Sequence, residues 1–219
     1  DGASNIISFL ATNNEKQALL SLDLSMQQSE KLLPSIDAVL KNVGLEAKDI
    51  SFLALTKGPG TFTGLRLAFS AAKALSLSFS IPIYAIPTLD LYANAFASWN
   101  GAVLSALDAK KNRFYASLYR KGKKNIGELD INACDLAKKL DPEEKILCVG
   151  PDAHMLIDAL VLENPNLDLH NFSIHVSAAM FHLQKMAEIQ YKEKSPPLND
   201  WEGPFYLRLS EAEENKAKP

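Results

Sequence analysis

The sequence predicts an α/β fold of two similar subdomains, and three observations lead to this prediction. Short apolar runs alternate with longer segments in which apolar residues recur at helical spacing. Both halves of the chain show the same order of elements, namely hairpin, helix, strand, helix, strand and helix. The length of 219 residues is enough for one large domain or two small ones. The two halves share no visible sequence identity, so the repeat is one of topology.

The first half begins with two apolar runs separated by Asn13 and Asn14, a pattern typical of two strands and a turn. A helix with apolar residues at i, i+3 and i+4 follows and stops at Gly44. The expected elements are strands at 6–11 and 17–23, a helix at 28–43, a strand at 51–56, a glycine-rich turn at 58–64, a helix at 64–80, a strand at 81–86 and a helix at 88–98 capped by Thr88.

The second half repeats this order. The expected elements are a hairpin of 102–108 and 113–119, a helix at 131–140, a strand at 145–149, a helix at 152–162, a strand at 172–176 and a closing helix at 177–191 capped by Ser177. A domain boundary is expected near Trp99, Asn100 and Gly101. This gives subdomains at 1–99 and 100–208, and the charged tail at 209–219 is predicted to be disordered.

Composition excludes several classes of protein. Hydrophobic residues make up 47% and charged residues 22%, a balance typical of globular proteins. The net charge of −3 leaves no basic footprint for nucleic acid, and no apolar run reaches the roughly 18 residues of a membrane span. Cys134 and Cys148 are expected to be free thiols in a reducing compartment. A cytoplasmic protein without a membrane segment is therefore expected.

One stretch, Lys57-Gly-Pro-Gly-Thr-Phe-Thr-Gly-Leu-Arg66, is unusual. A strand enters it and a helix leaves it, so backbone amides at the helix start could face an anion. Gly58 and Gly60 can adopt positive φ, and Thr61 or Thr63 can cap the helix. The stretch fits neither the Walker pattern nor the dinucleotide-binding fingerprint. The alternative interpretation, a tight turn between strand and helix, stays open.

The helix at 64–80 carries only two charged residues, Arg66 and Lys73. One side has the apolar stripe expected against a sheet, and the other side is mostly small, with Leu67, Ser70, Ala71, Ala74 and Ser78. A surface helix is normally polar there, so a helix that is apolar or small all round is buried on both sides. The outer face is a candidate protein contact, and burial by another part of the same chain is the alternative.

The run Gly-Pro-Gly-Thr-Phe-Thr-Gly-Leu-Arg resembles the signature of the bacterial TsaB family, also called YeaZ. Four other segments agree in order and spacing, and the resemblance extends from Asp1 to about Arg208. These segments are 29–34, 81–82, 108–116 and 206–208. The signature residues of this chain are Gly58, Pro59, Gly60, Thr61, Phe62, Thr63, Gly64 and Arg66.

The resemblance implies the ASKHA fold of actin-like and sugar-kinase-like proteins. It implies a non-catalytic scaffold for the paralogue TsaD, which transfers the threonylcarbamoyl group, together with the ATPase TsaE. The product is N6-threonylcarbamoyladenosine at position 37 of tRNAs that read codons beginning with A. The paralogue contact would use the first two helices, which here gives an interface of Ser29, Leu33, Leu67, Ser70, Ala71, Ala74 and Ser78.

Further expectations concern partners and cofactors. The same helices could pair with a second copy, so a homodimer is expected when the chain is alone. No cofactor is expected to bind strongly to this chain, although ATP could sit at a subunit junction of the complex. Contact with tRNA is expected only through the complex, and no contact with membranes is expected.

The sequence departs from the family pattern in two places. The family normally opens with an apolar strand that ends in Asp-Thr, whereas this chain begins with Asp1 and Gly2 at the matching place. A short apolar segment before Asp1 is therefore expected in the natural product. In addition, Gln28 stands where many relatives have His, so no role of that imidazole can be carried over.

The residues themselves argue against an enzyme. The four histidines include no pair four residues apart, so no metal site is expected at His154, His170, His175 or His182. Asp1 and Asp108 could mark the strand ends of an actin-like ATPase, but no glycine-rich phosphate hairpin follows Asp108, and an isolated Asp there is more often a turn former. No Gly-x-Ser-x-Gly elbow exists.

Two alternatives to the scaffold stay open. The first is a free-standing ASKHA-type phosphotransferase that uses ATP and acts on a small metabolite. The second is a homodimeric binding module outside tRNA modification, which the helix face fits equally well.

Overall fold

The computed structural model describes residues 1–23, 27–173 and 175–208, and its contacts divide the chain into two compact units. The first unit comprises Asp1–Leu91 and His175–Pro204, and the second Tyr92–Ile174 and Phe205–Pro219. This differs from the predicted division near residue 99. The last helix, α6 (Val176–Lys192), lies with the first unit because its apolar face packs against strands of that unit. The predicted disordered tail lies outside the described residues.

Four strands and three helices form most of the first unit. They are β1 (Ile6–Thr12), β2 (Gln17–Asp23), α1 (Gln28–Val43), β3 (Leu53–Gly58), α2 (Phe62–Phe79), β4 (Ile83–Pro87) and α6, with a short 3-10 helix at Ala47–Asp49. β1 pairs with β2 in antiparallel register, with Ile6 opposite Asp23, and β3 pairs with β4 in parallel. Asn13 closes the β1–β2 turn, since its side-chain oxygen accepts hydrogen bonds from the N–H groups of Glu15 and Lys16.

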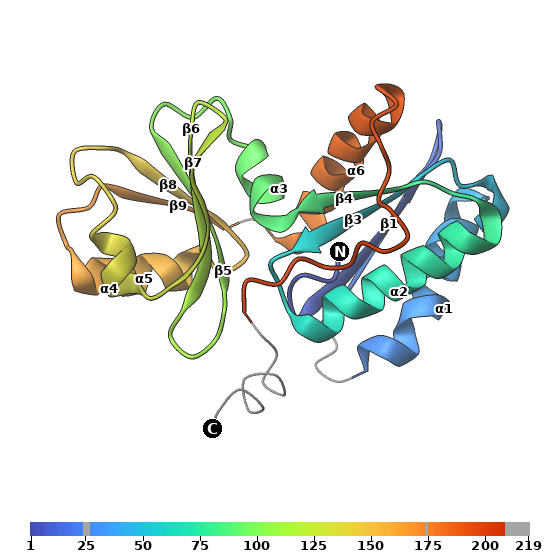
Figure 1. The fold of residues 1–219 in the computed structure, drawn as a ribbon, viewed down its shortest axis with the longest axis horizontal. Coiled ribbons are helices and arrows are strands. Elements are labelled where there is room, and N and C mark those ends of the chain that lie inside the picture. The colour runs from blue at the N-terminus through green and yellow to red at the C-terminus, as the bar shows by residue number, and fades with distance from the viewer. Residues whose placement is uncertain (24–26, 174, 209–219) are drawn as a thin grey trace. The chain divides into compact units, whose positions relative to one another are not determined.

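The helices of the first unit cover both faces of these strands. α1 and α2 lie on one side and α6 lies on the other (Figure 1). Ile7, Phe9 and Ala11 of β1 pack against α1 in one apolar cluster, and Leu55 of β3 packs against Phe69 of α2 in another. Strands covered on both faces are apolar throughout, which explains why these segments appear as short apolar runs in the sequence.

The second unit is built on a five-stranded sheet in the order β7-β6-β5-β8-β9. Its elements are β5 (Ala102–Asp108), β6 (Phe114–Arg120), β7 (Lys123–Ile131), α4 (Ala133–Ala137), β8 (Ile146–Gly150), α5 (Ala153–Glu163) and β9 (Leu169–Ser173). The division between the units falls within α3 (Thr88–Asn94), after Leu91. β5 runs antiparallel to β6 and parallel to β8. α4 and α5 lie on one face of the sheet and complete its largest apolar cluster (Figure 1).

The α/β fold class and the repeated order of elements are confirmed, with local corrections. The sequence missed β7, which lies at the sheet edge and is polar along most of its length. The helix expected at 88–98 ends at Asn94, and the hydroxyl of Thr88 accepts a hydrogen bond from Gly58 N–H instead of capping that helix. α6 begins at Val176, and its cap is His175, whose side chain accepts from Ser177 N–H.

Two expectations from composition can be compared with the structure. Cys134 and Cys148 are both free thiols, the first exposed and the second buried. Among the described residues, no helix is long and apolar enough to cross a membrane.

Candidate functional site

The signature stretch joins the end of β3 to the start of α2. Gly58 has a φ of 112°, which favours glycine, and the Gly58–Pro59 peptide bond is cis. The N–H of Gly58 donates to the hydroxyl of Thr88 at 3.2 Å, and this bond ties the loop to the end of β4. The first half of the signature therefore fixes the path of the chain between strand and helix.

The second half of the signature holds the N-terminal segment against α2. Thr61 N–H donates to the carbonyl of Ala3 at 2.8 Å, and the Thr61 hydroxyl donates to the carbonyl of Gly2 at 3.2 Å. A Cβ atom on Gly64 would lie 2.1 Å from the Gly2 carbonyl oxygen, and one on Gly60 would lie 2.5 Å from that of Ala3. Glycine is needed at these positions because two backbone segments touch there.

This geometry supports the tight-turn interpretation of the signature. Thr61 is the residue before α2, but its side chain makes no capping hydrogen bond to the helix, and Thr63 lies inside α2. The Thr61 N–H, which could have faced an anion, instead donates its hydrogen bond to the Ala3 carbonyl. The expected capping by these threonines is therefore wrong, and the polar groups of Thr61 hold the N-terminal segment instead.

Asp1 lies in the same buried corner and is itself 8% exposed. Its Oδ1 accepts from Ala3 N–H at 2.8 Å and from the Thr56 hydroxyl at 2.7 Å. The Asp1 carboxylate thus links the N-terminal segment to β3.

Most residues of the predicted interface lie on exposed surface of α1 and α2, and their role as an interface stays a prediction. Ser70, Ala74 and Ser78 are exposed, as are Ser29 and Leu33 of α1, and the Leu33 residue is 63% exposed. The sequence reasoning missed Leu77, which is 87% exposed on the same face. Its signal was present, since Leu77 follows Ser70 and Ala74 at spacings of seven and three.

Ala71 is a correction to the predicted interface. It is only 7% exposed and packs in the cluster of Ile7, Leu40 and other residues of β1 and α1. Leu67 is half-buried against the same cluster. The physical reason is that α1 packs beside α2, so this side of α2 is covered from within the unit. Phe79, the last residue of α2, is 46% exposed.

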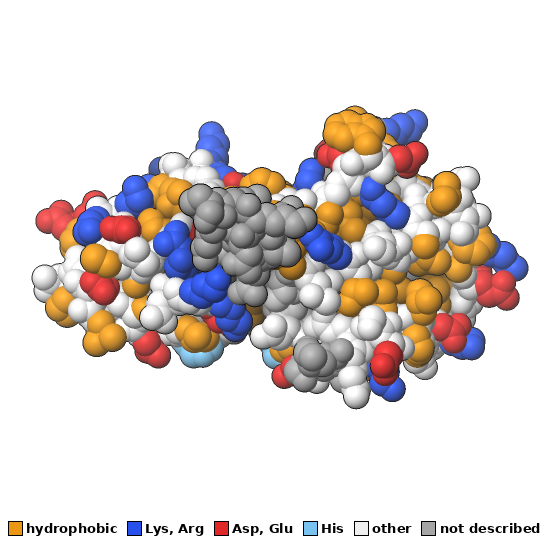
Figure 2. Space-filling model, turned by 60° about the horizontal axis from the view of Figure 1, so that its bottom comes forward, with side chains coloured by type: hydrophobic (Ala, Val, Ile, Leu, Met, Phe, Trp, Pro, Cys, Tyr) orange, Lys and Arg blue, Asp and Glu red, His pale blue; other side chains and the backbone are white. Residues whose placement is uncertain are grey.

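Charge is sparse on this face. The Arg66 guanidinium lies 5.1 Å from the ring centre of Phe62, and Lys73 Nζ donates to the carbonyl of Asp200 at 2.6 Å. In Figure 2, the middle of the right-hand part shows hydrophobic and white surface, and Lys, Arg, Asp and Glu side chains lie around its edges. When a partner covers such a surface, little free energy is spent on removing water from charged groups.

The structure also places the residues considered for catalysis. Asp108 Oδ1 accepts from Lys110 N–H at 2.8 Å and its Oδ2 binds Lys110 Nζ at 2.7 Å, so Asp108 shapes the turn after β5. Within the described ranges, no group of three or more His, Cys, Asp or Glu side chains could hold a metal ion.

Comparison with known proteins assigns the family. The family model described as "TsaD: tRNA N6-adenosine threonylcarbamoyltransferase" matches residues 23–160, more than half of the chain. The chain belongs to this family. The relatives described below are named TsaB or YeaZ, so this chain is a TsaB-type member of the family.

A Bacillus subtilis relative, "tRNA threonylcarbamoyladenosine biosynthesis protein TsaB", is 26% identical over 203 residues, which cover 87% of this chain and 83% of the relative. A protein of the same name from Buchnera aphidicola is 35% identical over 143 residues, covering 60% of this chain and 66% of the relative. The solved structure "YeaZ from Pseudomonas aeruginosa" aligns with a TM-score of 0.74 over 94% of this chain and 96% of that one, at 18% identity. This chain therefore shares the fold of that structure, which together with the family match fits the fold class predicted from the sequence.

Proposed function

We propose that this TsaB-type chain is a non-catalytic partner of a TsaD-type threonylcarbamoyltransferase in the synthesis of N6-threonylcarbamoyladenosine at position 37 of tRNAs that read ANN codons. The biosynthetic pathway follows from the names of its relatives. The site follows from the surface of α1 and α2.

The outer face of α2 gives the strongest support for this site. Ser70, Ala74, Leu77 and Ser78 form an exposed surface without charge, and Leu77 exposes 87% of its surface to water. Small residues let a second helix approach closely, and a neighbouring leucine then gains about 2 kcal/mol when it is buried. A total burial of about 1,600 Å² would be typical of a stable and specific interface.

The absence of catalysis in this proposal rests on what the candidate groups already do. Asp108 shapes a turn with Lys110, and Asp152 Oδ2 accepts from Asp108 N–H at 2.9 Å. Paired carboxylates directed at a metal and a nucleotide are what an ASKHA phosphotransferase needs, and these two are bound within the fold. The chain would therefore act by positioning its paralogue.

The assembly we propose has further members. A TsaE-type ATPase joins the TsaD-type subunit and this chain, and ATP occupies a subunit junction rather than a strong site on this chain. Contact with tRNA takes place through the assembled complex in the cytoplasm. A homodimer through α1 and α2 forms when the paralogue is absent.

The test is the substitution Ala74→Arg, which places a long charged side chain in the centre of the face. Because Ala74 is exposed, the fold should stay intact, while binding of the TsaD-type protein should weaken at least about 100-fold. Dissociation constants from sedimentation velocity, with circular dichroism as the check on folding, measure this.

The matched control is Ala178→Arg on α6. Ala178 is also an exposed helical alanine, but α6 lies on the opposite side of the strands from α1 and α2 (Figure 1). We expect binding by this variant to equal that of the wild type. Equal binding by both variants would show that α2 is not the interface.

A further inference from the structure

The segment that follows α6 places a tryptophan on the surface of the first unit. Trp201 is 83% exposed, although tryptophan is a highly buried residue type on average. The segment runs beside β4 and α2, where it is drawn in red in Figure 1. Single exposed apolar side chains are common on protein surfaces. Trp201 differs from such side chains in how firmly its backbone is held and in what lies beside it.

A tight turn carries Trp201. Glu202 N–H donates to the carbonyl of Asn199 at 3.0 Å, so residues 199–202 form a β-turn with Trp201 at its third position. The Glu202 carboxylate closes the turn, because its Oε2 accepts from Asn199 N–H at 2.9 Å and from Asn199 Nδ2 at 3.0 Å. Hydrogen bonds from Asn199 N–H and from Lys57 hold the pKa of Glu202 below its ordinary value, so this carboxylate is charged at neutral pH.

Three further contacts fix the turn to the body of the unit. Lys73 Nζ of α2 donates to the Asp200 carbonyl at 2.6 Å, and Lys57 Nζ of β3 lies 3.3 Å from Glu202 Oε1. Just before the turn, Leu198 N–H donates to a carbonyl of β4 at 2.8 Å, and its side chain packs in an apolar cluster of β3, β4 and α2. A side chain on a turn held in this way loses little conformational freedom when it binds a partner.

The contact with Lys73 also places Trp201 next to the outer face of α2. Asp200, the neighbour of Trp201, lies within reach of one lysine side chain from that helix. On the surface of a helix, residues three and four positions apart are neighbours, and for Lys73 these include Ser70 and Leu77. Both belong to the exposed face that we propose as the partner site. The exposed indole is therefore continuous with this face.

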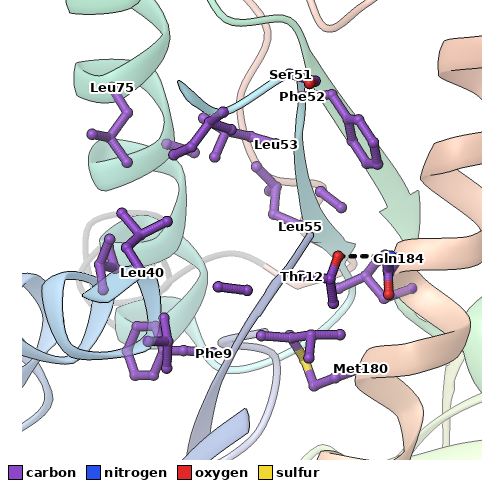
Figure 3. A pocket seen from close by; sticks show the side chains of 18 of the residues that line it. Phe9, Thr12, Leu40, Ser51, Phe52, Leu53, Leu55, Leu75, Met180 and Gln184 are labelled. Atoms are coloured by element: carbon purple, nitrogen blue, oxygen red, sulfur yellow. Dashed lines mark hydrogen bonds between the residues drawn. The ribbon is translucent and has the colours of Figure 1, made fainter. Parts of the chain in front are cut away.

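The opposite side of α2 is turned to the interior of the unit. Leu75 lines a cavity of about 670 Å³ together with Leu40 of α1 and Leu53 of β3 (Figure 3). Because each residue turns a helix by about 100°, Leu77 lies on the other side of α2 from Leu75. Contact of α2 with a partner is thus confined to the side that Trp201 flanks.

The chemistry of the indole defines what a partner must offer. Tryptophan combines a large apolar ring with an N–H that only donates, and this N–H usually finds an acceptor when the ring is buried. Tryptophan is also enriched among the few residues that carry most of the binding energy of an interface. A partner that covers Leu77 and its small neighbours would therefore cover Trp201 with an apolar pocket that contains a hydrogen-bond acceptor.

We infer that Trp201 is an anchor residue of the partner interface and inserts into an apolar pocket of the TsaD-type protein. This inference rests on the proposed function and adds the turn of residues 199–202 to an interface otherwise made of α1 and α2. The continuity of the indole with the α2 face supports this partner, and the hydrogen bonds of the turn position the ring before binding.

The first test is binding of the TsaD-type protein to Trp201→Ala. Because Trp201 is exposed, the fold should stay intact by circular dichroism, while the dissociation constant should rise about 30-fold or more. Phe181→Ala is the matched control, since Phe181 is also an exposed aromatic residue but lies on α6, on the opposite side of the strands. We expect the control to bind as tightly as the wild type. Equal binding by the two variants would overturn the inference.

Ala74→Arg, measured beside these variants, separates this inference from the proposed function. If Ala74→Arg weakens binding and Trp201→Ala does not, the α2 interface stands and Trp201 lies outside it. If neither substitution weakens binding, the proposed function and the inference both fail. If Trp201→Ala weakens only the homodimer of this chain, the indole contacts a second copy and the inference is wrong.

Fluorine NMR tests directly whether the partner covers the indole. The chain is labelled with 5-fluorotryptophan and the TsaD-type protein is left unlabelled, and Trp201→Phe identifies which of the two tryptophan signals belongs to Trp201. In the free chain, this signal should shift between H₂O and D₂O because the ring is exposed. We expect saturating TsaD-type protein to remove most of this solvent isotope shift. An isotope shift that the partner leaves unchanged would overturn the inference.

Discussion

At the scale of single residues, the signature of this family is explained by contact between two backbones. Gly2 and Gly64 approach so closely that a Cβ atom on either would lie less than 2.5 Å from the carbonyl oxygen of the other. Thr61 adds hydrogen bonds to Gly2 and Ala3 across the same contact. The glycines of the signature therefore allow the N-terminal segment to pack closely against α2.

The substitution Gly64→Ala tests this explanation. In an ordinary helix interior, alanine is favoured over glycine by about 1 kcal/mol. At Gly64, however, the new methyl group would lie 2.1 Å from the Gly2 carbonyl oxygen. We expect the clash to outweigh the propensity and to lower the free energy of unfolding by about 2 kcal/mol in urea titrations.

Gly127→Ala is the matched control, since a Cβ atom at Gly127 has no neighbour within 4 Å. Its free energy of unfolding should change by less than about 0.5 kcal/mol. If Gly64→Ala were as stable as this control, the close approach of the two backbones would not explain the glycine.

The candidate site could be predicted from the sequence only in part, and Ala71 shows why. Helical periodicity placed it on the same side as Ser70 and Ala74, which are exposed. Burial of Ala71 depends on the direction from which α1 packs, and that direction is a property of the tertiary structure. The predicted face omitted Leu77 because it was defined by small residues, although Leu77 follows Ala74 at helical spacing and is exposed.

At the scale of elements, an arginine–carboxylate cluster holds the C-terminal segment to the second unit. Arg208 Nε and Nη2 each donate to the Asp130 carboxylate at 2.8 Å, and Arg208 Nη1 donates to the Ala109 carbonyl at 3.0 Å. Arg113 Nε donates to the same carboxylate at 2.7 Å. Asp130 lies on β7, so the cluster joins the chain end, the β5–β6 turn and the edge strand.

This cluster predicts a pH dependence. Partial burial disfavours the Asp130 carboxylate, but hydrogen bonds from Arg208 and Arg113 outweigh burial and hold its pKa below the ordinary value. A carboxyl group with a lowered folded pKa stabilises the fold above its unfolded pKa of about 4, and this contribution is lost as the pH falls through the folded pKa.

Asp130→Asn should therefore lower the free energy of unfolding by about 2 kcal/mol at pH 7, and the difference from the wild type should shrink below about pH 4. Asp37→Asn is the control, since Asp37 forms an exposed pair with Lys41 and should contribute less than about 0.5 kcal/mol. Urea titrations at several pH values measure both, and a difference for Asp130→Asn that does not change with pH would contradict the assignment.

Most helices and strands could be predicted from the sequence, but β7 could not. The buried strands β5 and β8 are mostly apolar and were predicted, whereas the edge strand β7 is mostly polar and was not predicted. The feature that indicates β7 is the turn before it. Lys121 and Gly122 both have positive φ, as two-residue hairpin turns require. The sequence predicted α6 as a helix, but periodicity could not say which unit it covers.

At the scale of the whole molecule, the partner role that we propose rests on the charge of the chain and on the outer face of α2. The net charge of −3 gives no basic surface for tRNA, and the Asp108 carboxylate is bound to Lys110 in the turn after β5. The face of Ser70, Ala74, Leu77 and Ser78 is exposed and uncharged. An exposed and uncharged face supports our proposal that the chain works through a protein partner.

Sedimentation velocity of this chain, alone and mixed with the TsaD-type protein of the same organism, tests this account most directly. We predict a homodimer alone, and in the mixture a heavier species that replaces both parents. Unchanged sedimentation of both proteins, even with ATP and the TsaE-type ATPase present, would contradict the partner role.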